Sequence, residues 1–104
     1  MTRRACRVDG PHGAIRDALR AVGCKVYDCS GVGGDFPDLL VRVPGYPQSR
    51  LFATPCLLLL EVKDGTLSPS RRKLKPGQEQ FRQDFAPFVI VVESVEDALN
   101  LVGK

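Results

Sequence analysis

The chain of 104 residues has no tryptophan, one methionine and a single histidine, His12. Its four cysteines form no C-x-x-C pair, so a cysteine–histidine zinc site would need ligands scattered over several strands. The longest apolar run, CLLLLEV, is far too short to cross a membrane. We therefore expect no membrane span and no compact zinc motif. Because no signal peptide is evident, we also expect reduced thiols in the cytoplasm, with Cys24 and Cys56 as small core residues.

The chain has a small excess of positive charge: its 15 lysines and arginines outnumber its 12 acidic residues, which gives a formal charge of +3. That excess does not establish a polyanionic partner. The positions of the basic residues say more, because they cluster at Arg3, Arg4 and Arg7 and again at Arg71, Arg72, Lys73 and Lys75. Such clusters suit phosphate contacts, although a solvated loop is the commoner reason for a run of charge.

The order of apolar patterns predicts one α/β domain over residues 1–104. Ile15, Leu19 and Val22 recur at helical spacing before Gly23, so a helix is expected over 12–22. Further helices are expected from Pro76 to about Phe85 and after Ser94. Strands are expected over 24–29, 37–43, 56–63 and 88–93. Because the strand over 56–63 is apolar on both faces, we expect it to be central and covered on both sides.

The ends of two neighbouring strands carry the residues with the most chemical interest. Pro37-Asp38 opens the strand over 37–43, and Glu61-Val62-Lys63 closes the strand over 56–63. Side chains alternate along a strand, so Glu61 and Lys63 project from the same face. Two carboxylates and a lysine at the rim of a buried sheet suit metal-assisted phosphodiester hydrolysis. The plain alternative is a strand end that reaches solvent.

A glycine-rich loop, SGVGGD, comes just before Pro37-Asp38. It is either a simple flexible connection or a backbone that lets a phosphate approach the site closely. It does not match a nucleotide-binding P-loop, because no Gly-Lys-Ser/Thr follows.

Taken together, these stretches resemble a known nuclease family. The matching segments are IRDALRAVG, GVGGDFPDLLV, LLLLEVKDGTLSPSRRKLKPGQEQF and VIVVESVEDAL. They are similar to the VRR-NUC (virus-type replication-repair nuclease) group of the PD-(D/E)xK superfamily, over nearly the whole chain. The resemblance implies a restriction-endonuclease-like αβββαβ(α) core, in which a mixed central sheet is flanked by helices.

The resemblance also implies an endodeoxyribonuclease that depends on Mg²⁺ or Mn²⁺. Asp38, Glu61 and the backbone carbonyl of Val62 would hold the metal, which needs few protein ligands. Lys63 would orient the attacking water or stabilise the transition state. Gln78, three residues before Phe81, would hydrogen-bond within the site, whereas its plain alternative is an exposed surface glutamine.

Stand-alone members of the group are expected to be homodimers that cut four-way (Holliday) junctions, and this chain is expected to be of phage or prophage origin and to act in a bacterial host cell. The alternative is a nicking or flap endonuclease. The basic residues Arg71, Arg72, Lys73 and Lys75 would contact the DNA backbone beside the active site. Segment 44–55 is a candidate for dimer or junction contacts.

One position departs from the family pattern. Ala14 lies about where the first helix usually supplies a glutamate. Three explanations are open: that acid is dispensable, His12 or Asp9 substitutes for it, or the chain carries an inactivating change. The last would leave a catalytically impaired module that binds branched DNA without cutting it.

Overall fold

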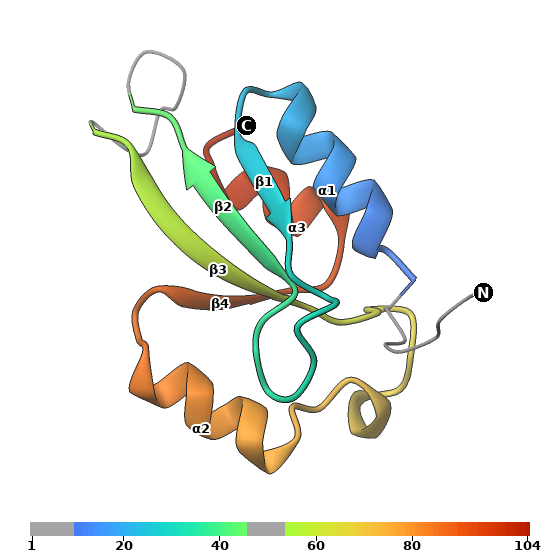
Figure 1. Cartoon of the computed structure of the whole chain (residues 1–104). Coiled ribbons are helices and arrows are strands. Elements are labelled where there is room, and N and C mark those ends of the chain that lie inside the picture. The colour runs from blue at the N-terminus through green and yellow to red at the C-terminus, as the bar shows by residue number, and fades with distance from the viewer. Residues whose placement is uncertain (1–9, 46–53) are drawn as a thin grey trace, which may run out of the picture.

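The computed structural model describes residues 10–45 and 54–104, and its elements follow the predicted order (Figure 1). They are α1 (His12–Ala21), β1 (Lys25–Asp28), β2 (Leu39–Val43), β3 (Cys56–Val62), a 3₁₀-helix η1 (Pro69–Arg71), α2 (Pro76–Asp84), β4 (Val89–Val92) and α3 (Val95–Leu101). Every predicted helix and strand is present, with ends that differ by one or two residues. Only η1 was not predicted, because the basic loop around it shows no periodic apolar pattern.

The strands form one mixed sheet in the order β1-β2-β3-β4. The first three strands are antiparallel, and Leu39 of β2 lies opposite Leu60 of β3. β4 runs parallel to β3, with Leu60 opposite Ile90, so the chain needs a crossover between them, and α2 lies within it. The fold is therefore mixed α/β, with helices flanking a four-stranded sheet.

Helices α1 and α3 pack against each other on one face of this sheet (Figure 1). Of the predicted stripe, Ile15 and Leu19 are fully buried there, whereas Val22 is half-buried. Ala98 of α3 and Val102, the residue after α3, are buried against them. These residues enclose the core with the inward side chains of the strands, which are Leu39, Val41, Val43, Leu58, Leu60, Val62 and Val92.

The prediction that strand 56–63 is covered on both faces is wrong for its first half. β3 is central, but Leu57 is 57% exposed, whereas its neighbour Leu58 is buried. The reason is the placement of α2, which lies beside the end of β4 instead of across the sheet (Figure 1). Leu57 therefore points from a sheet face that no described helix covers.

The thiols behave as core groups where the structure describes them. Cys24 is buried as predicted, and Cys56 is half-buried against the core. Burial raises the pKa of both thiols, which favours the neutral form. Within residues 10–45 and 54–104, no helix is long and apolar enough to cross a membrane.

Candidate active site

The predicted carboxylates meet in one cavity at the ends of β2 and β3, on the sheet face away from α1 and α3. The cavity has a volume of about 240 Å³, and both Asp38 and Glu61 line it. Lys75 and Gln78 of the α2 region close one side. The loop after β1 supplies the remaining lining residues, Ser30, Gly33, Gly34 and Phe36.

Asp38 is fixed to β3 by its backbone and by its side chain. Its amide N–H donates to the carbonyl oxygen of Leu60 at 2.9 Å. Its Oδ2 atom accepts a hydrogen bond from the amide of Val62 at 2.8 Å. A carboxylate that accepts a backbone N–H is held in one orientation, so the strand pairing itself sets Asp38 beside the Glu61–Lys63 segment.

Glu61 and Lys63 do share one face, as the strand alternation predicts, and both are largely buried. Their side chains are 7% and 12% exposed, and Lys63 Nζ lies 3.8 Å from Glu61 Oε2. A buried charge is costly unless it is paired and hydrogen-bonded, so this pair is a built feature of the interior. The plain alternative, a strand end whose charged side chains reach solvent, therefore does not fit Glu61 and Lys63.

Gln78 bridges this pair from α2. Its Nε2 donates to Glu61 Oε2 at 3.2 Å, and its Oε1 accepts from Lys63 Nζ at 3.2 Å. The same Oε1 also accepts the backbone N–H of Lys75 at 2.9 Å, which satisfies a donor at the start of α2. Both ends of the amide therefore have partners of the correct kind, and Gln78 is not an exposed surface residue.

The glycine loop makes a tight turn over the cavity. Gly33 and Gly34 have φ of +78° and +61°, which is the left-handed region that favours glycine. The turn returns Phe36 onto Phe81 of α2, with ring centroids 5.5 Å apart. The loop after β1 therefore forms one wall of the cavity and packs against α2 through Phe36.

The basic segment divides into two kinds of residue. Arg72 Nη1 donates to both carboxylate oxygens of Glu93, at 3.0 and 3.1 Å, and its Nε donates to the Leu67 carbonyl at 3.0 Å. Arg72 therefore ties the loop to the residue that follows β4. The other three predicted DNA-binding residues are exposed: Arg71, Lys73 and Lys75.

Of the residues considered for the missing helix acid, the structure describes His12 but not Asp9. His12 is buried at the start of α1, where its Nε2 lies 3.6 Å from Asp28 Oδ1, and it does not line the cavity. Ala14 is exposed on the same helix. Asp9 lies outside the described residues, as do Arg3, Arg4 and Arg7.

Asp28 is a polar centre that the sequence reasoning did not single out. Its Oδ1 accepts from the amide and the hydroxyl of Ser30, at 2.9 and 2.6 Å. Burial raises the pKa of Asp28, but these hydrogen bonds, with His12 and Arg16 nearby, outweigh burial and hold the pKa below its ordinary value. The D-x-S spacing of a local Asx turn was the available signal.

The donor set of the cavity fits a hard divalent cation. No group of three or more His, Cys, Asp or Glu side chains in the described part of the chain is arranged to hold a metal ion. Mg²⁺ needs fewer, because it commonly binds one or two carboxylates and completes its shell with water and substrate phosphate. Asp38 and Glu61 are the two residues able to provide this, and the Val62 carbonyl stays a predicted ligand.

Comparison with protein-family models, with curated proteins and with solved structures gives no match to this chain. The family resemblance therefore rests on the sequence motifs alone.

The Asp28–Ser30 turn predicts a pH-dependent contribution to stability. Because the folded-state pKa of Asp28 is lowered, its ionised form stabilises the fold above the unfolded pKa of about 3.9, and this stabilisation is lost as pH falls through the folded value. Ser30→Ala should lower the free energy of unfolding by about 1 kcal/mol at pH 7. In urea denaturation, that difference should shrink steadily at acid pH. A difference that is constant with pH would contradict this assignment, and in an Asp28→Asn background Ser30→Ala should lose its pH dependence.

Proposed function

We propose that this protein is a metal-dependent endodeoxyribonuclease with a PD-(D/E)xK active site of the VRR-NUC type. One observation supports this most strongly: Asp38, Glu61, Lys63 and Gln78, which span 41 residues of sequence, converge on one site at the ends of two paired strands. Charged and amide groups are costly to bury, so their convergence beside a cavity favours a functional site.

In this proposal Asp38 and Glu61 hold one Mg²⁺ or Mn²⁺ ion, with the carbonyl of Val62 as a further ligand. When bound, the ion would lower the pKa of a coordinated water and neutralise charge that develops on the phosphate. The hydrogen bond from the Val62 amide keeps Asp38 in place, so the carboxylate has little freedom to lose when it binds.

Lys63 supplies the fixed positive charge of the reaction. Gln78 and Glu61, which line the cavity, hold its ammonium group, and the Lys63 side chain is only 12% exposed. A cation held there stabilises charge on a phosphate in the transition state more strongly than it would in bulk solvent. Gln78 acts on both partners at once, because it positions Lys63 through its oxygen and Glu61 through its nitrogen.

The DNA backbone would reach the cavity over the basic segment. Lys75 lines the cavity and is exposed, and Arg71 and Lys73 are exposed a few residues before it. These three cations suit a phosphate track that ends at the carboxylates. The preferred substrate in this proposal is a four-way DNA junction cut by a homodimer, in a phage-infected or bacterial cell, with a nick or flap as the alternative substrate.

A second candidate is a module that binds branched DNA without cutting it. The observation that favours it is the small carboxylate set, since only Asp38 and Glu61 among the described acidic residues line the cavity. The two candidates predict the same binding surface and differ only in cleavage.

Cleavage of a labelled four-way junction tests the proposal directly. The junction is compared with linear duplex and a 5′ flap, in Mg²⁺, in Mn²⁺ and in chelator. We expect metal-dependent paired nicks on the junction, and Glu61→Gln and Lys63→Ala should each lower the rate at least about 100-fold. Gln78→Ala should lower it less, because it removes only a positioning contact.

Glu96→Gln is the matched control for Glu61→Gln, because Glu96 is an exposed glutamate on α3. It should cut at the wild-type rate. Binding of the junction with no cleavage in either metal would contradict the nuclease and support the binding module. Cleavage of the flap, with no cleavage of the junction, would support the flap as the substrate.

The division of the basic segment predicts different roles for two adjacent arginines. Arg71→Ala should weaken DNA binding alike for all sequences and reduce the slope of log K against log [salt] by about one. Arg72→Ala should instead lower the unfolding free energy, by about 1 kcal/mol, because it breaks the contact with Glu93. Fluorescence anisotropy across a salt series and urea denaturation measure the two effects. An unchanged slope of log K against log [salt] in Arg71→Ala would show that this segment does not contact the DNA backbone.

A further inference from the structure

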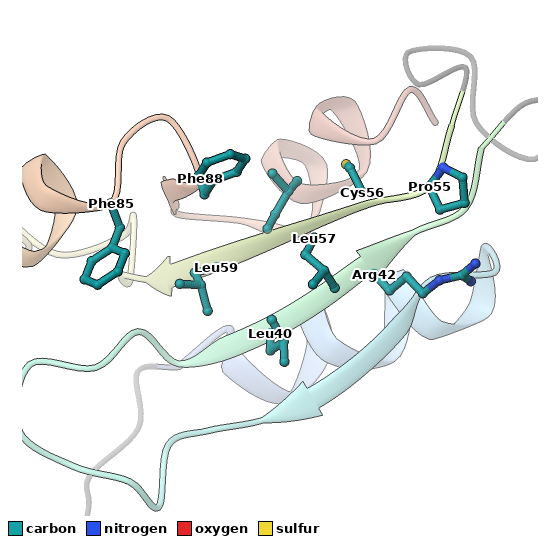
Figure 2. A pocket seen from close by; sticks show the side chains of 9 residues that line it. Leu40, Arg42, Pro55, Cys56, Leu57, Leu59, Phe85 and Phe88 are labelled. Atoms are coloured by element: carbon teal, nitrogen blue, oxygen red, sulfur yellow. The ribbon is translucent and has the colours of Figure 1, made fainter.

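The sheet face opposite α1 and α3 carries an apolar groove of about 770 Å³ (Figure 2). We call this surface the open groove, and it is defined by Leu40, Arg42, Leu57, Leu59, Phe85 and Phe88. Leu57, Phe85 and Phe88 are each at least half exposed, at 57%, 50% and 56%. Contiguous apolar patches of this kind mark interaction surfaces on folded domains.

Two rows of side chains lead along this face from the open groove to the active site. Side chains two residues apart share a face of a strand, and directly opposed residues share a face of an antiparallel pair. The rows are therefore Leu57, Leu59 and Glu61 on β3 and Arg42, Leu40 and Asp38 on β2. Arg42 lies four residues from Asp38, a distance of about 13 Å along the strand that a few nucleotides can span. The open groove is thus continuous with the cavity that holds the carboxylates.

The edge strand β1 extends this face with one aromatic residue and one cation. Tyr27 lies opposite Leu40, and Lys25 lies opposite Arg42. A second hollow of about 260 Å³ is lined by these four residues among others, and Tyr27 is 69% exposed. The strand therefore adds a third exposed aromatic side chain and a second cation to the face.

The charge of this face suits a polyanion. Arg42 and Lys25 are exposed, and among the residues that the structure describes no acidic side chain lines either hollow. The acidic groups of the same face, Asp38 and Glu61, line the neighbouring cavity instead. Two exposed cations without acidic neighbours attract the phosphate backbone of a nucleic acid.

The apolar floor of the open groove favours unpaired nucleotides over duplex DNA. A duplex presents charged backbones and the edges of its bases, and it hides the base faces within the stack, so it cannot cover leucine and phenylalanine side chains. Unpaired bases expose apolar π-faces that stack on aromatic side chains without regard to sequence. An open sheet face with exposed aromatic side chains is one form that such a binding site takes.

We propose that the open groove binds unpaired nucleotides of the DNA strand that is cut at Asp38 and Glu61. Their bases stack on Phe85 and Phe88, and Arg42 binds the phosphate furthest from the carboxylates. This inference deepens the proposed function, and it rests on that function for one point: the strand is cut beside these two carboxylates.

Duplex DNA occupies the other approach to the cavity. The basic segment ends at Lys75, which lines the cavity but not the open groove. A strand that runs from this segment into the groove is paired on one side of the metal and unpaired on the other. The substrate class is therefore a branched DNA whose cut strand has unpaired nucleotides next to the scissile phosphate, as in a flap or at an opened junction.

Binding of a labelled oligothymidylate in the presence of chelator tests the open groove without any cleavage. Fluorescence anisotropy should show that the wild type binds it, and a blunt duplex of equal length serves as the comparison. Phe88→Ala should weaken single-strand binding about 5- to 150-fold, the loss of one stacked base, and leave duplex binding unchanged. Phe88 is replaced because Phe85 also stacks on Phe81 of α2, at 4.5 Å. Since the Phe88 side chain is 56% exposed, the variant should keep the wild-type melting temperature.

The sign of a charge placed at Leu57 distinguishes a nucleic acid from an apolar protein partner. Leu57→Asp should weaken single-strand binding at least about tenfold, because it sets a negative charge opposite Arg42 and against the phosphates. Leu57→Lys should bind at least as tightly as the wild type. Asn100→Asp is the matched control, since Asn100 is exposed on α3 across the sheet, and its affinity should be unchanged.

The dependence of binding on salt separates the cation from the stacking residue. Arg42→Ala should reduce the slope of log K against log [salt] by about 0.7, the value for one phosphate contact on a single strand. Phe88→Ala should leave that slope unchanged, because stacking releases no counterion.

Three results would overturn the inference. They are no binding of oligothymidylate by the wild type at low salt, equal losses of single-strand and duplex binding in Phe88→Ala, and equal losses of single-strand binding in Leu57→Asp and Leu57→Lys. The last result would assign the open groove to an apolar protein partner, to which a charge of either sign is unfavourable.

Failure of this inference is distinguishable from failure of the nuclease. Single-strand binding that depends on Phe88, without cleavage in Mg²⁺ or Mn²⁺, supports the groove and contradicts the nuclease. Cleavage by Phe88→Ala at the wild-type rate, with unchanged single-strand affinity, supports the nuclease and contradicts the groove. If both proposals hold, Phe88→Ala should slow cleavage of a flap more than cleavage of a nicked duplex, which has no unpaired nucleotide.

Discussion

The pairing of β2 with β3 is the constraint on which the rest of the site depends. It sets Leu39 opposite Leu60, and it lets the amide and carboxylate of Asp38 bond to the β3 backbone. Because side chains alternate along a strand, a slip of one residue would turn Glu61 and Lys63 into the core and Leu60 out of it. The apolar core therefore enforces the register, and the register places the two carboxylates in the same cavity.

Helix α2 is the second component, and it is held by the site more than by the core. None of its residues is buried, and its N-terminal end is tied to Glu61 and Lys63 through Gln78. Phe81 of α2 packs on Phe36 of the loop that lines the cavity. The helix that carries Gln78 is therefore fixed both to the end of β3 and to the loop after β1.

Much of this structure was accessible from the sequence, since α1 and all four strands follow from apolar patterns, and α2 and α3 follow from the start signals at Pro76 and Ser94. Gln78 was reached through the family resemblance. The coverage of β3 was mispredicted because an apolar pattern shows which side chains avoid water and not what covers them, and Leu57 stays 57% exposed. The ion pair of Arg72 with Glu93 was not predicted, because the two residues are distant in sequence and only the fold brings them together. Asp28 was overlooked although its turn with Ser30 is local, whereas its position beside His12 depends on the fold.

Metal binding to the two carboxylates is the central claim, and it is measured most directly by titrating Mn²⁺ into the DNA-free protein under electron paramagnetic resonance. Our account predicts saturable binding of about one ion per chain, competed by Mg²⁺. Binding should be strongly weakened in Asp38→Asn and in Glu61→Gln and unchanged in Glu96→Gln. Absence of saturable binding, or binding that both carboxamide variants retain, would contradict the assignment of Asp38 and Glu61 as the metal-holding pair.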